Sequence, residues 1–339
     1  MKAKPQGILV LFLVLQASCQ SNATVEVPLS PSPIPPATGQ PAPTAVEPVP
    51  TGTAIPSPVE LVSIITGETE PLGRPIGLAV DTLGNLYVVD AEDSRVLKFD
   101  AEGSLLTSWG SRGSGDGEFN ITTHGGGRIA VDDEGNVYVA DSSSRVQKFD
   151  SEGRFLAVWG SPGKGDGQSG PRISLAVDGR GKVYVGDIDN HRVLVFDNNG
   201  EFLQSWGGRD SGGAELFGPV GIAVDRDGVV YVVEFLNSRV QQFDENGNSL
   251  ATFFIQPVDG KLVTPGDLAV DTHGNLVVTD WSYHRVVMLN RSGDVLGAWG
   301  EPGTGDGQFQ EPWTIAVAPT GELYVADSLN GRIQVFRGE

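Results

Sequence analysis

The sequence predicts an all-β fold built from one repeated unit of short strands. The unit joins a strand such as Leu86–Asp90 to a strand such as Arg95–Asp100 through a tight loop, and it occurs six times. The chain contains 46 glycines and short Val/Tyr/Phe runs without a long helical period, which favours strands. The residue that ends the first strand of each unit recurs every 46–51 residues, at Asp90, Asp141, Asp187, Glu234, Asp280 and Asp327. Four-stranded sheets repeated at this period are typical of a β-propeller, so we expect six blades.

The charge balance and the cysteine content narrow the classes of function. The 339-residue chain has 43 acidic and 23 basic residues, with a formal net charge of −20. Nucleic-acid binding depends largely on Lys and Arg side chains that neutralise phosphates, so we expect no nucleic-acid partner. The single cysteine excludes an internal disulfide bond and a thiolate-rich metal cluster.

Residues 1–18 have the features of an export signal peptide. Two lysines precede the apolar run 7–15, which is too short to span a bilayer as a helix. Because Cys19 follows small residues, the segment resembles a bacterial lipoprotein signal, in which the cysteine becomes the acylated first residue. It departs from that pattern at Gln16, where Leu is usual, and an ordinary signal peptide with an incidental cysteine is the alternative. The resemblance implies an exported protein of the cell envelope or cell surface, attached to the membrane only through a lipid at Cys19.

Residues 19–58 form a proline-rich segment with almost no charge or aromatic content. Such a segment cannot bury enough apolar surface to offset the entropy lost on ordering. We therefore expect a disordered tether over residues 19–58 and a folded propeller over residues 59–339.

Each complete blade is expected to contain four antiparallel strands joined by tight turns. Gly84 and Gly103 stand where such turns need a left-handed residue, and the same turn pattern recurs along the chain. In the first blade the expected strands are residues 76–81, 86–90, 95–100 and 105–110.

The two ends of the repeat array predict how the ring closes. The sixth unit stops after its third strand, close to Phe336, and has no fourth strand of its own. Residues 60–66 precede the first unit and align with a fourth strand. We expect them to complete the last blade, which would remove an open sheet edge.

The repeats resemble NHL repeats, as residues 221–243 and 314–336 show most clearly. The blade-linking pattern Gly-x-Gly-Asp-Gly-Gln-Phe, present at residues 303–309, also resembles that family. The chain departs from the pattern at Glu234, which replaces Asp, and at Ala318, where other blades have Asp. The resemblance implies the fold but says little about function, because propellers carry many unrelated activities.

An acidic residue and an arginine flank the loop in every unit. Six carboxylates near an axis could hold a cation, but an arginine accompanies each of them, which favours structural ion pairs. The pairs are Asp90 with Arg95, Asp141 with Arg145, Asp187 with Arg192, Asp280 with Arg285 and Asp327 with Arg332, together with Glu234 and Arg239. The Gly-Asp-Gly-Gln loops offer too few carboxylates for calcium and are expected to be turns.

The loops between second and third strands and the crossings between blades are expected to share one face. Phe235, Trp281 and Tyr283 lie at loop tips that usually carry small polar residues. Exposed loop aromatics indicate binding, although some simply cap the rim of a core. We expect a monomer that binds a protein, peptide or glycan without a cofactor. The candidate binding residues are Arg74, His124, Arg172, His191, Phe235, Trp281, Tyr283, His284 and Trp313.

The alternative is a metal-dependent lyase or hydrolase with its site at the axial mouth. An amidating lyase with NHL-type repeats holds zinc with several histidines, and the resemblance implies that His124, His191 and His284 could do the same, with Asp189 beside them. The blades that carry these histidines are not adjacent in a convincing way, and no nucleophile–base pair stands out. We therefore assign no metal and leave the enzyme hypothesis as the second interpretation.

Overall fold

The computed structural model describes residues 57–122, 126–208 and 215–338. The expected signal peptide, Cys19, almost all of the expected tether and His124 lie outside the described residues. The described residues contain no helix that is long and apolar enough to cross a membrane.

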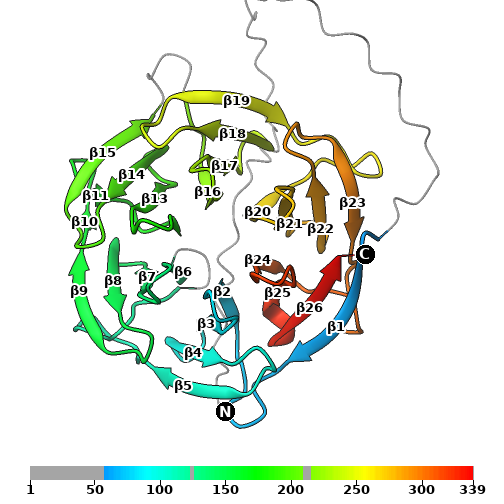
Figure 1. The fold of residues 1–339 in the computed structure, drawn as a ribbon, viewed down its shortest axis with the longest axis horizontal. Helices are drawn as coiled ribbons and strands as arrows, with labels where there is room; N and C mark the ends of the chain where they lie inside the picture. The colour runs from blue at the N-terminus through cyan, green and yellow to red at the C-terminus, as the bar shows by residue number, and fades with distance from the viewer. Residues whose placement is uncertain (1–56, 123–125, 209–214, 339) are drawn as a thin grey trace, which may run out of the picture. The chain divides into compact units, whose positions relative to one another are not determined.

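Six four-stranded antiparallel sheets surround a central axis, so the predicted six-bladed all-β propeller is confirmed (Figure 1). Blade 1 contains β2 (Pro75–Val80), β3 (Leu86–Asp90), β4 (Arg95–Phe99) and β5 (Leu105–Trp109). Blade 2 contains β6 (Arg128–Val131), β7 (Val137–Asp141), β8 (Arg145–Phe149) and β9 (Phe155–Trp159). Blade 3 contains β12 (Ile173–Val177), β13 (Val183–Asp187), β14 (Arg192–Phe196) and β15 (Phe202–Gly207).

The other three blades repeat this order from the axis outwards. Blade 4 contains β16 (Pro219–Val224), β17 (Val230–Glu234), β18 (Arg239–Phe243) and β19 (Ser249–Phe254). Blade 5 contains β20 (Pro265–Val270), β21 (Leu276–Asp280), β22 (Arg285–Leu289) and β23 (Val295–Trp299). Blade 6 contains β24 (Pro312–Val317), β25 (Leu323–Asp327), β26 (Arg332–Gly338) and β1 (Val59–Ile65). The crossings add the short parallel pair β10 (Ser161–Pro162) and β11 (Gln168–Ser169), and the 3-10 turn η1 (Ser328–Asn330) follows β25.

The strands form because short apolar runs alternate with turns of one design. At the first hairpin, the Asp81 carboxylate accepts the backbone N–H groups of Leu83 and Asn85, both at 2.9 Å. Gly84 adopts φ +88°, a left-handed conformation that glycine reaches without steric cost. These local bonds satisfy the turn without help from the rest of the chain, so a short sequence is enough to specify it.

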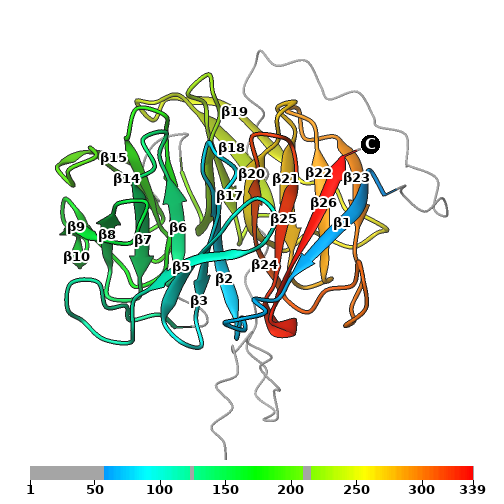
Figure 2. The same cartoon turned by 60° about the horizontal axis from the view of Figure 1, so that its bottom comes forward.

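The ring is closed by the first strand, as the sequence predicts. β1 runs antiparallel to β26, from the pair Val59 and Gly338 to the pair Ile65 and Ile333. Figures 1 and 2 show β1 in blue lying along β26 in red, on the outer side of the last blade. Because β26 would otherwise be an edge strand, this pairing leaves no blade incomplete.

Apolar clusters between neighbouring blades hold the ring together, and outer-strand tryptophans contribute to them. Trp109 packs against the turn of the next blade at Gly153, where an added Cβ atom would lie 2.4 Å from the indole. Trp159 and Gly200 repeat the contact, and so do Trp206 and Gly247. The glycines therefore give the tryptophans room to cover each junction.

Candidate binding face

Because the strands of each blade are antiparallel, the connections between them lie alternately on two opposite faces of the ring (Figure 2). Strands two and three of each blade are joined on one face, where the crossings between blades also lie, and we call this the loop face. The remaining hairpin turns, such as residues 81–85 and 100–104, lie at the opposite ends of the strands, and we call this the turn face.

On the loop face each acidic residue and its arginine form an ion pair. The carboxylates are fully buried, and charged groups remain buried only when they are paired. Most arginines also donate to carbonyl groups of the preceding crossing, as Arg145 does to Glu118 at 2.7 Å. The N···O distances are 3.8 Å for Asp90 and Arg95, 2.8 Å for Asp141 and Arg145, 3.2 Å for Asp187 and Arg192, 2.8 Å for Glu234 and Arg239, 2.8 Å for Asp280 and Arg285, and 2.7 Å for Asp327 and Arg332.

The two described candidate histidines make equivalent backbone contacts in blades 3 and 5. His191 and His284 have φ angles of +61° and +52°, and each is the last loop residue before the arginine of its blade. The Nδ1 atom of His191 accepts the N–H group of Gly218 at 3.1 Å, and that of His284 accepts the N–H group of Glu311 at 3.0 Å. Each ring therefore ties its loop to the following crossing.

Two of the three histidines of the expected metal site, His191 and His284, lie among the described residues. Residues 57–122, 126–208 and 215–338 contain no group of three or more His, Cys, Asp or Glu side chains that could hold a metal ion. Asp189, expected beside such a site, instead accepts a hydrogen bond at 2.8 Å from Nε of Arg172. Among the described residues, His191 and His284 make contacts that support the loops. His124 lies outside the described residues.

Three aromatic side chains from consecutive blades meet on the loop face, close to the central axis of the ring. The rings of Phe235 and Trp281 are stacked, with centroids 6.2 Å apart and an angle of 18°. Trp281 in turn contacts Trp313, with centroids 6.5 Å apart and an angle of 55°. We call Phe235, Trp281 and Trp313 the aromatic ledge. Phe235 is 37 % exposed and both tryptophans are half-buried, so the ledge presents apolar surface to solvent.

Trp313 fixes the position of the ledge relative to the axis. It lies in the innermost strand of blade 6, β24, and packs against the apolar cluster shared by blades 1 and 2. The loops of blades 4 and 5 place the other two rings beside it. The ledge therefore borders the axial mouth, and the core behind it restricts its movement.

Tyr283 is set apart from the ledge although it lies in the same loop as Trp281. Its ring is covered by two cations, with Lys261 Nζ 4.9 Å and Arg285 Cζ 5.2 Å from its centroid. Cation–π contacts of this kind hold the ring in place. Tyr283 is 36 % exposed and extends the apolar surface of the loop, but it forms no ring contact with Trp281 among the described residues.

The two candidate arginines are neutralised by carboxylates of the same face. Arg74 of blade 1 pairs with Glu311, just before β24, at 2.9 Å. Arg172 pairs with Asp189 within blade 3. Arg74 thereby links the last blade to the first, and neither arginine presents an uncompensated charge to a ligand.

An ion pair across the axis is a feature that the sequence reasoning missed. Arg128 Nη1 of blade 2 lies 3.2 Å from Asp267 Oδ2 of blade 5, and Arg128 also donates to the Gly266 carbonyl at 3.0 Å. Thr314 donates to the same carboxylate at 2.6 Å. Burial raises the pKa of Asp267 above its ordinary value, although the guanidinium of Arg128 opposes that rise.

Aligned repeats carry a signal for this pair. Arg128 and Asp267 stand at the same register position of their inner strands, where the other blades have Gly77, Ser174, Gly221 and Thr314. Blades 2 and 5 face each other in a ring of six, so one cation and one anion at this position can meet across the axis. The cavity around them, of about 230 Å³, is lined by the inner strands.

Three of the repeats match a known family of repeats. The family model described as NHL repeat matches residues 72–99, 218–243 and 309–336, which cover most of the inner three strands of blades 1, 4 and 6. The chain is a six-bladed β-propeller that contains NHL repeats.

Curated relatives match this propeller over short segments. The peptidyl-glycine alpha-amidating monooxygenase of Mus musculus is 39% identical over 80 residues, which are 22% of this chain and 8% of that protein. NHL repeat-containing protein 3 of Homo sapiens is 33% identical over 75 residues, which are 21% of this chain and 22% of that protein. The chain thus spans between about a twelfth and a quarter of the length of these relatives.

Solved structures show the same fold at low sequence identity. A structure of streptogramin B lyase is 14% identical with a TM-score of 0.54, and the likeness covers 82% of this chain and 98% of that one. Virginiamycin B lyase from Staphylococcus aureus is 12% identical with a TM-score of 0.54, and the likeness covers 82% and 88% of the two chains. At this identity the likeness concerns the fold alone.

Proposed function

We propose that this NHL propeller is a non-catalytic binding module that recognises a protein, peptide or glycan on its loop face. The observation that carries the proposal is the aromatic ledge of Phe235, Trp281 and Trp313. Three rings joined through Trp281 at an axial mouth offer a rigid apolar surface, because folding has already ordered them.

The surroundings of the ledge favour recognition by shape and apolar contact. The nearby charges of Arg74, Arg172 and the six loop arginines are paired with carboxylates, so they give no strong attraction for an anion. The exposed side chain of Leu236 lies next to Phe235 in the chain and enlarges the apolar area. A ligand with an apolar side chain, or a sugar ring with a flat C–H face, would complement this surface.

Replacing Trp281 by Ala tests this proposal, because Trp281 contacts both other rings of the ledge. Wild-type protein and Trp281→Ala are applied to peptide and glycan arrays, and the best ligand is then titrated while intrinsic tryptophan fluorescence is recorded. We expect a loss of affinity of at least tenfold, since central aromatic residues carry most binding energy. Leu156→Ala, at an exposed position of β9, is the matched control and should bind as the wild type does. Equal binding by Trp281→Ala would reject the ledge as the binding site.

A metal-dependent lyase or hydrolase is the second candidate, because matched proteins include an amidating monooxygenase and two lyases by name. The backbone contacts of His191 and His284 count against a zinc site built from them. Metal analysis of protein purified without chelator separates the two functions. A stoichiometric metal that His191→Ala and His284→Ala remove would favour the enzyme.

We further propose that the propeller is exported and lipid-anchored through Cys19, with residues 19–58 as its tether. The basic start, the apolar run 7–15 and the position of Cys19 support this proposal. One acyl chain alone gives weak, reversible attachment, so stable anchoring would need more than one. Cells fed labelled palmitate should label the wild-type protein and leave Cys19→Ala unlabelled. Label on neither protein, or on both, would contradict the anchor.

A further inference from the structure

Neighbouring blades are joined on the turn face by a recurring kind of hydrogen bond. The outer hairpin turn of each following blade presents a backbone carbonyl, and a side chain of the preceding blade donates to it. This occurs at four junctions, between Lys98 and Ser151 at 2.9 Å, Lys148 and Asn198 at 3.0 Å, Gln204 and Glu245 at 2.9 Å, and Gln242 and Arg291 at 2.8 Å.

The junction of blades 1 and 2 shows how an ammonium group fits there. Lys98 Nζ lies 5.5 Å from the centroid of the Tyr87 ring, and it also contacts the Glu152 carboxylate at 3.3 Å. The lysine stem is buried between the blades. A carbonyl, a carboxylate and an aromatic face thus surround one alkylammonium group, which is the arrangement that such a cation prefers.

The junction of blades 6 and 1 keeps this surrounding arrangement but lacks the lysine. The counterparts are the Ala101 carbonyl, the Glu102 carboxylate and the Tyr324 ring, since residues 100–103 form the same turn as residues 150–153. Val335 pairs with Tyr324 across the strands as Lys98 pairs with Tyr87, and its side chain has no donor. Among the described residues, no side chain donates to the Ala101 carbonyl and no cation pairs with Glu102.

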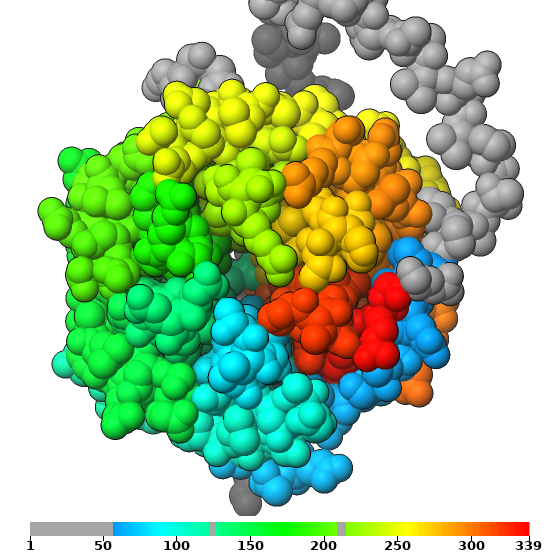
Figure 3. Space-filling model, in the orientation of Figure 1, coloured from blue at the N-terminus to red at the C-terminus, as the bar shows by residue number. Residues whose placement is uncertain are grey.

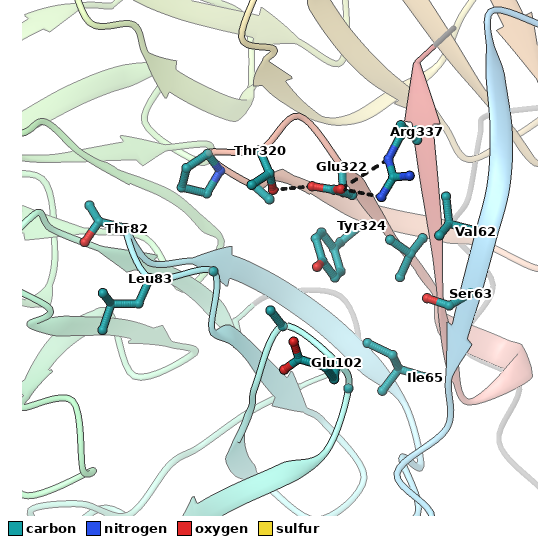
Figure 4. Close-up of a pocket in the computed structure, with 16 residues that line it drawn as sticks. Val62, Ser63, Ile65, Thr82, Leu83, Glu102, Thr320, Glu322, Tyr324 and Arg337 are labelled. Carbon is teal, nitrogen blue, oxygen red and sulfur yellow. Dashed lines mark hydrogen bonds and ion pairs between the residues drawn. The ribbon is translucent and has the colours of Figure 1, made fainter.

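Two further departures from the repeat enlarge the space at this junction. Ile65 occupies the outer-strand position of Trp109 and packs on Gly103 as the tryptophan packs on Gly153. Ala318 replaces the turn aspartate. The result is a pocket of about 280 Å³, lined mainly by apolar groups that include Ile65, Leu83 and Val335 (Figure 4).

The hydroxyl of Tyr324 lacks the aspartate partner that three of its counterparts have. The hydroxyls of Tyr87, Tyr138 and Tyr231 donate to the turn aspartates of their blades at 3.2, 2.9 and 3.1 Å. Ala318 cannot accept such a bond, and no other hydrogen bond to the Tyr324 hydroxyl occurs among the described residues. Tyr324 is only 5 % exposed and lines the pocket, so its ring forms part of the pocket wall, and its hydroxyl has no hydrogen-bond partner among the described residues.

One cationic side chain, that of Arg337, lies at the rim of the pocket, and it is already paired with a carboxylate. Arg337 is 2.8 Å from the Glu322 carboxylate, which also accepts a hydrogen bond from Thr320 (Figure 4). The negative charge of Glu102 is left to act on the pocket.

We propose that this pocket binds a primary alkylammonium group on a short aliphatic chain. The ammonium group would take the place of the missing lysine, donating to the Ala101 carbonyl and the Glu102 carboxylate over the face of Tyr324. The aliphatic stem would contact Ile65 and Val335. At about 280 Å³ the pocket lies at the lower end of the size range of small-molecule sites, which suits a group of this size. The group could belong to a free amine or to a lysine side chain of a peptide.

Titration with matched small probes tests the proposal. Full-length protein is titrated with n-butylammonium chloride, with n-butanol and with sodium chloride of equal ionic strength, and binding is followed by NMR chemical shifts. We expect saturable binding of the amine with at least tenfold weaker binding of the alcohol. Nα-acetyl-lysine methylamide and its norleucine analogue form a second pair, and tighter binding of the lysine compound than of butylammonium would identify a peptide as the source. Failure of both amines to saturate, or equal binding of n-butanol, would overturn the proposal.

Two variants test whether the amine binds in this pocket. Val335→Lys supplies the missing side chain within the protein, so we expect a raised melting temperature and at least tenfold weaker amine binding. Glu102→Gln, at an exposed turn position where folding is not at risk, should weaken amine binding about fivefold or more. Unchanged amine affinity in either folded variant would reject the site.

The matched control removes the corresponding donor at another junction. Lys98→Val removes the lysine between blades 1 and 2 and should give the folded protein a second, weaker equivalent of amine binding beside Tyr87. Trp281→Ala should leave amine binding unaltered, because the aromatic ledge lies on the opposite face. A wild-type stoichiometry of zero, or loss of binding in Trp281→Ala, would refute this assignment.

Discussion

Five tyrosines lie in the second strands of the blades, with their hydroxyls directed towards the turn face. Burial is the largest cause that raises the pKa of each of them, and neighbouring carboxylates add to the rise. For Tyr231 the pKa rises to about 12 from its ordinary value of 10.0, with the charge of Asp225 as the next cause. The hydroxyls are thus held in the protonated form by the folded ring.

These shifts predict a loss of stability at alkaline pH. The folded pKa of Tyr231 lies above the unfolded value, so its contribution is fully present below pH 10 and is lost as the pH rises from 10 towards about 12. We expect the melting temperature to fall over that window, and to fall less steeply in Tyr231→Phe. At pH 7 the same variant should lose about 1 kcal/mol with its hydrogen bond to Asp225. Parallel curves for the two proteins between pH 8 and pH 11.5 would contradict the assignment.

At the scale of single residues, the sequence reveals which side chains are unusual but not which of them meet in the candidate site. Phe235, Trp281 and Tyr283 are all visible as unusual loop residues, but only the structure separates the ledge from Tyr283, because ring contacts depend on how neighbouring blades are spaced. The pair of Arg128 and Asp267 is 139 residues apart in the chain, and no local pattern connects its members. Ala318 stands out in the repeat, yet its effect depends on Val335 of the same blade and on Ile65, which reaches that blade only when the ring closes.

At the scale of elements, β1 has the largest structural role for its length. It covers the outer edge of β26 with seven residues and extends the apolar contacts of blades 5 and 6 through Val59. Without it, the backbone donors and acceptors of β26 would be open to pairing with another chain.

Deletion of residues 59–67 should therefore cause aggregation. The ring would lose one of its 24 blade strands and expose an edge beside the apolar cluster of Leu323 and Phe336. Light scattering and a thermal melt of the purified deletion variant check this expectation. Ile64→Thr, a partly buried position of β1 that leaves the backbone pairing intact, serves as the control and should stay soluble. A soluble deletion variant with the melting temperature of the wild type would disprove the role of β1.

The strands were the most predictable elements because each turn is specified locally. The expected strands 86–90 and 95–100 agree with β3 and β4 to within one residue, and residues 60–66 overlap β1. The Asp and Gly of each turn bond within five residues, so the information lies in the chain segment itself. Contacts between blades are different, because side chains from distant repeats meet there and the sequence alone does not say which of them face one another.

At the scale of the whole molecule, the two faces carry different chemistry on one scaffold. The loop face presents aromatic rings beside paired charges, whereas the turn face carries aspartate-lined turns and the pocket where the ring closes. Ring closure places blades 6 and 1 together from opposite ends of the chain. Departures from the repeat can accumulate there in both end segments at once, as Ile65, Ala318 and Val335 illustrate.

The ion pair of Arg128 and Asp267 affects how a solute could move along the axial channel. It joins opposite walls of the axial channel, which is seen as a narrow hollow at the centre of the ring in the view down the axis (Figure 3). The pair therefore narrows the channel at one level between its two openings. A solute that crossed the ring would have to pass this ion pair, whereas guests bound on the loop face and on the turn face would not need to meet.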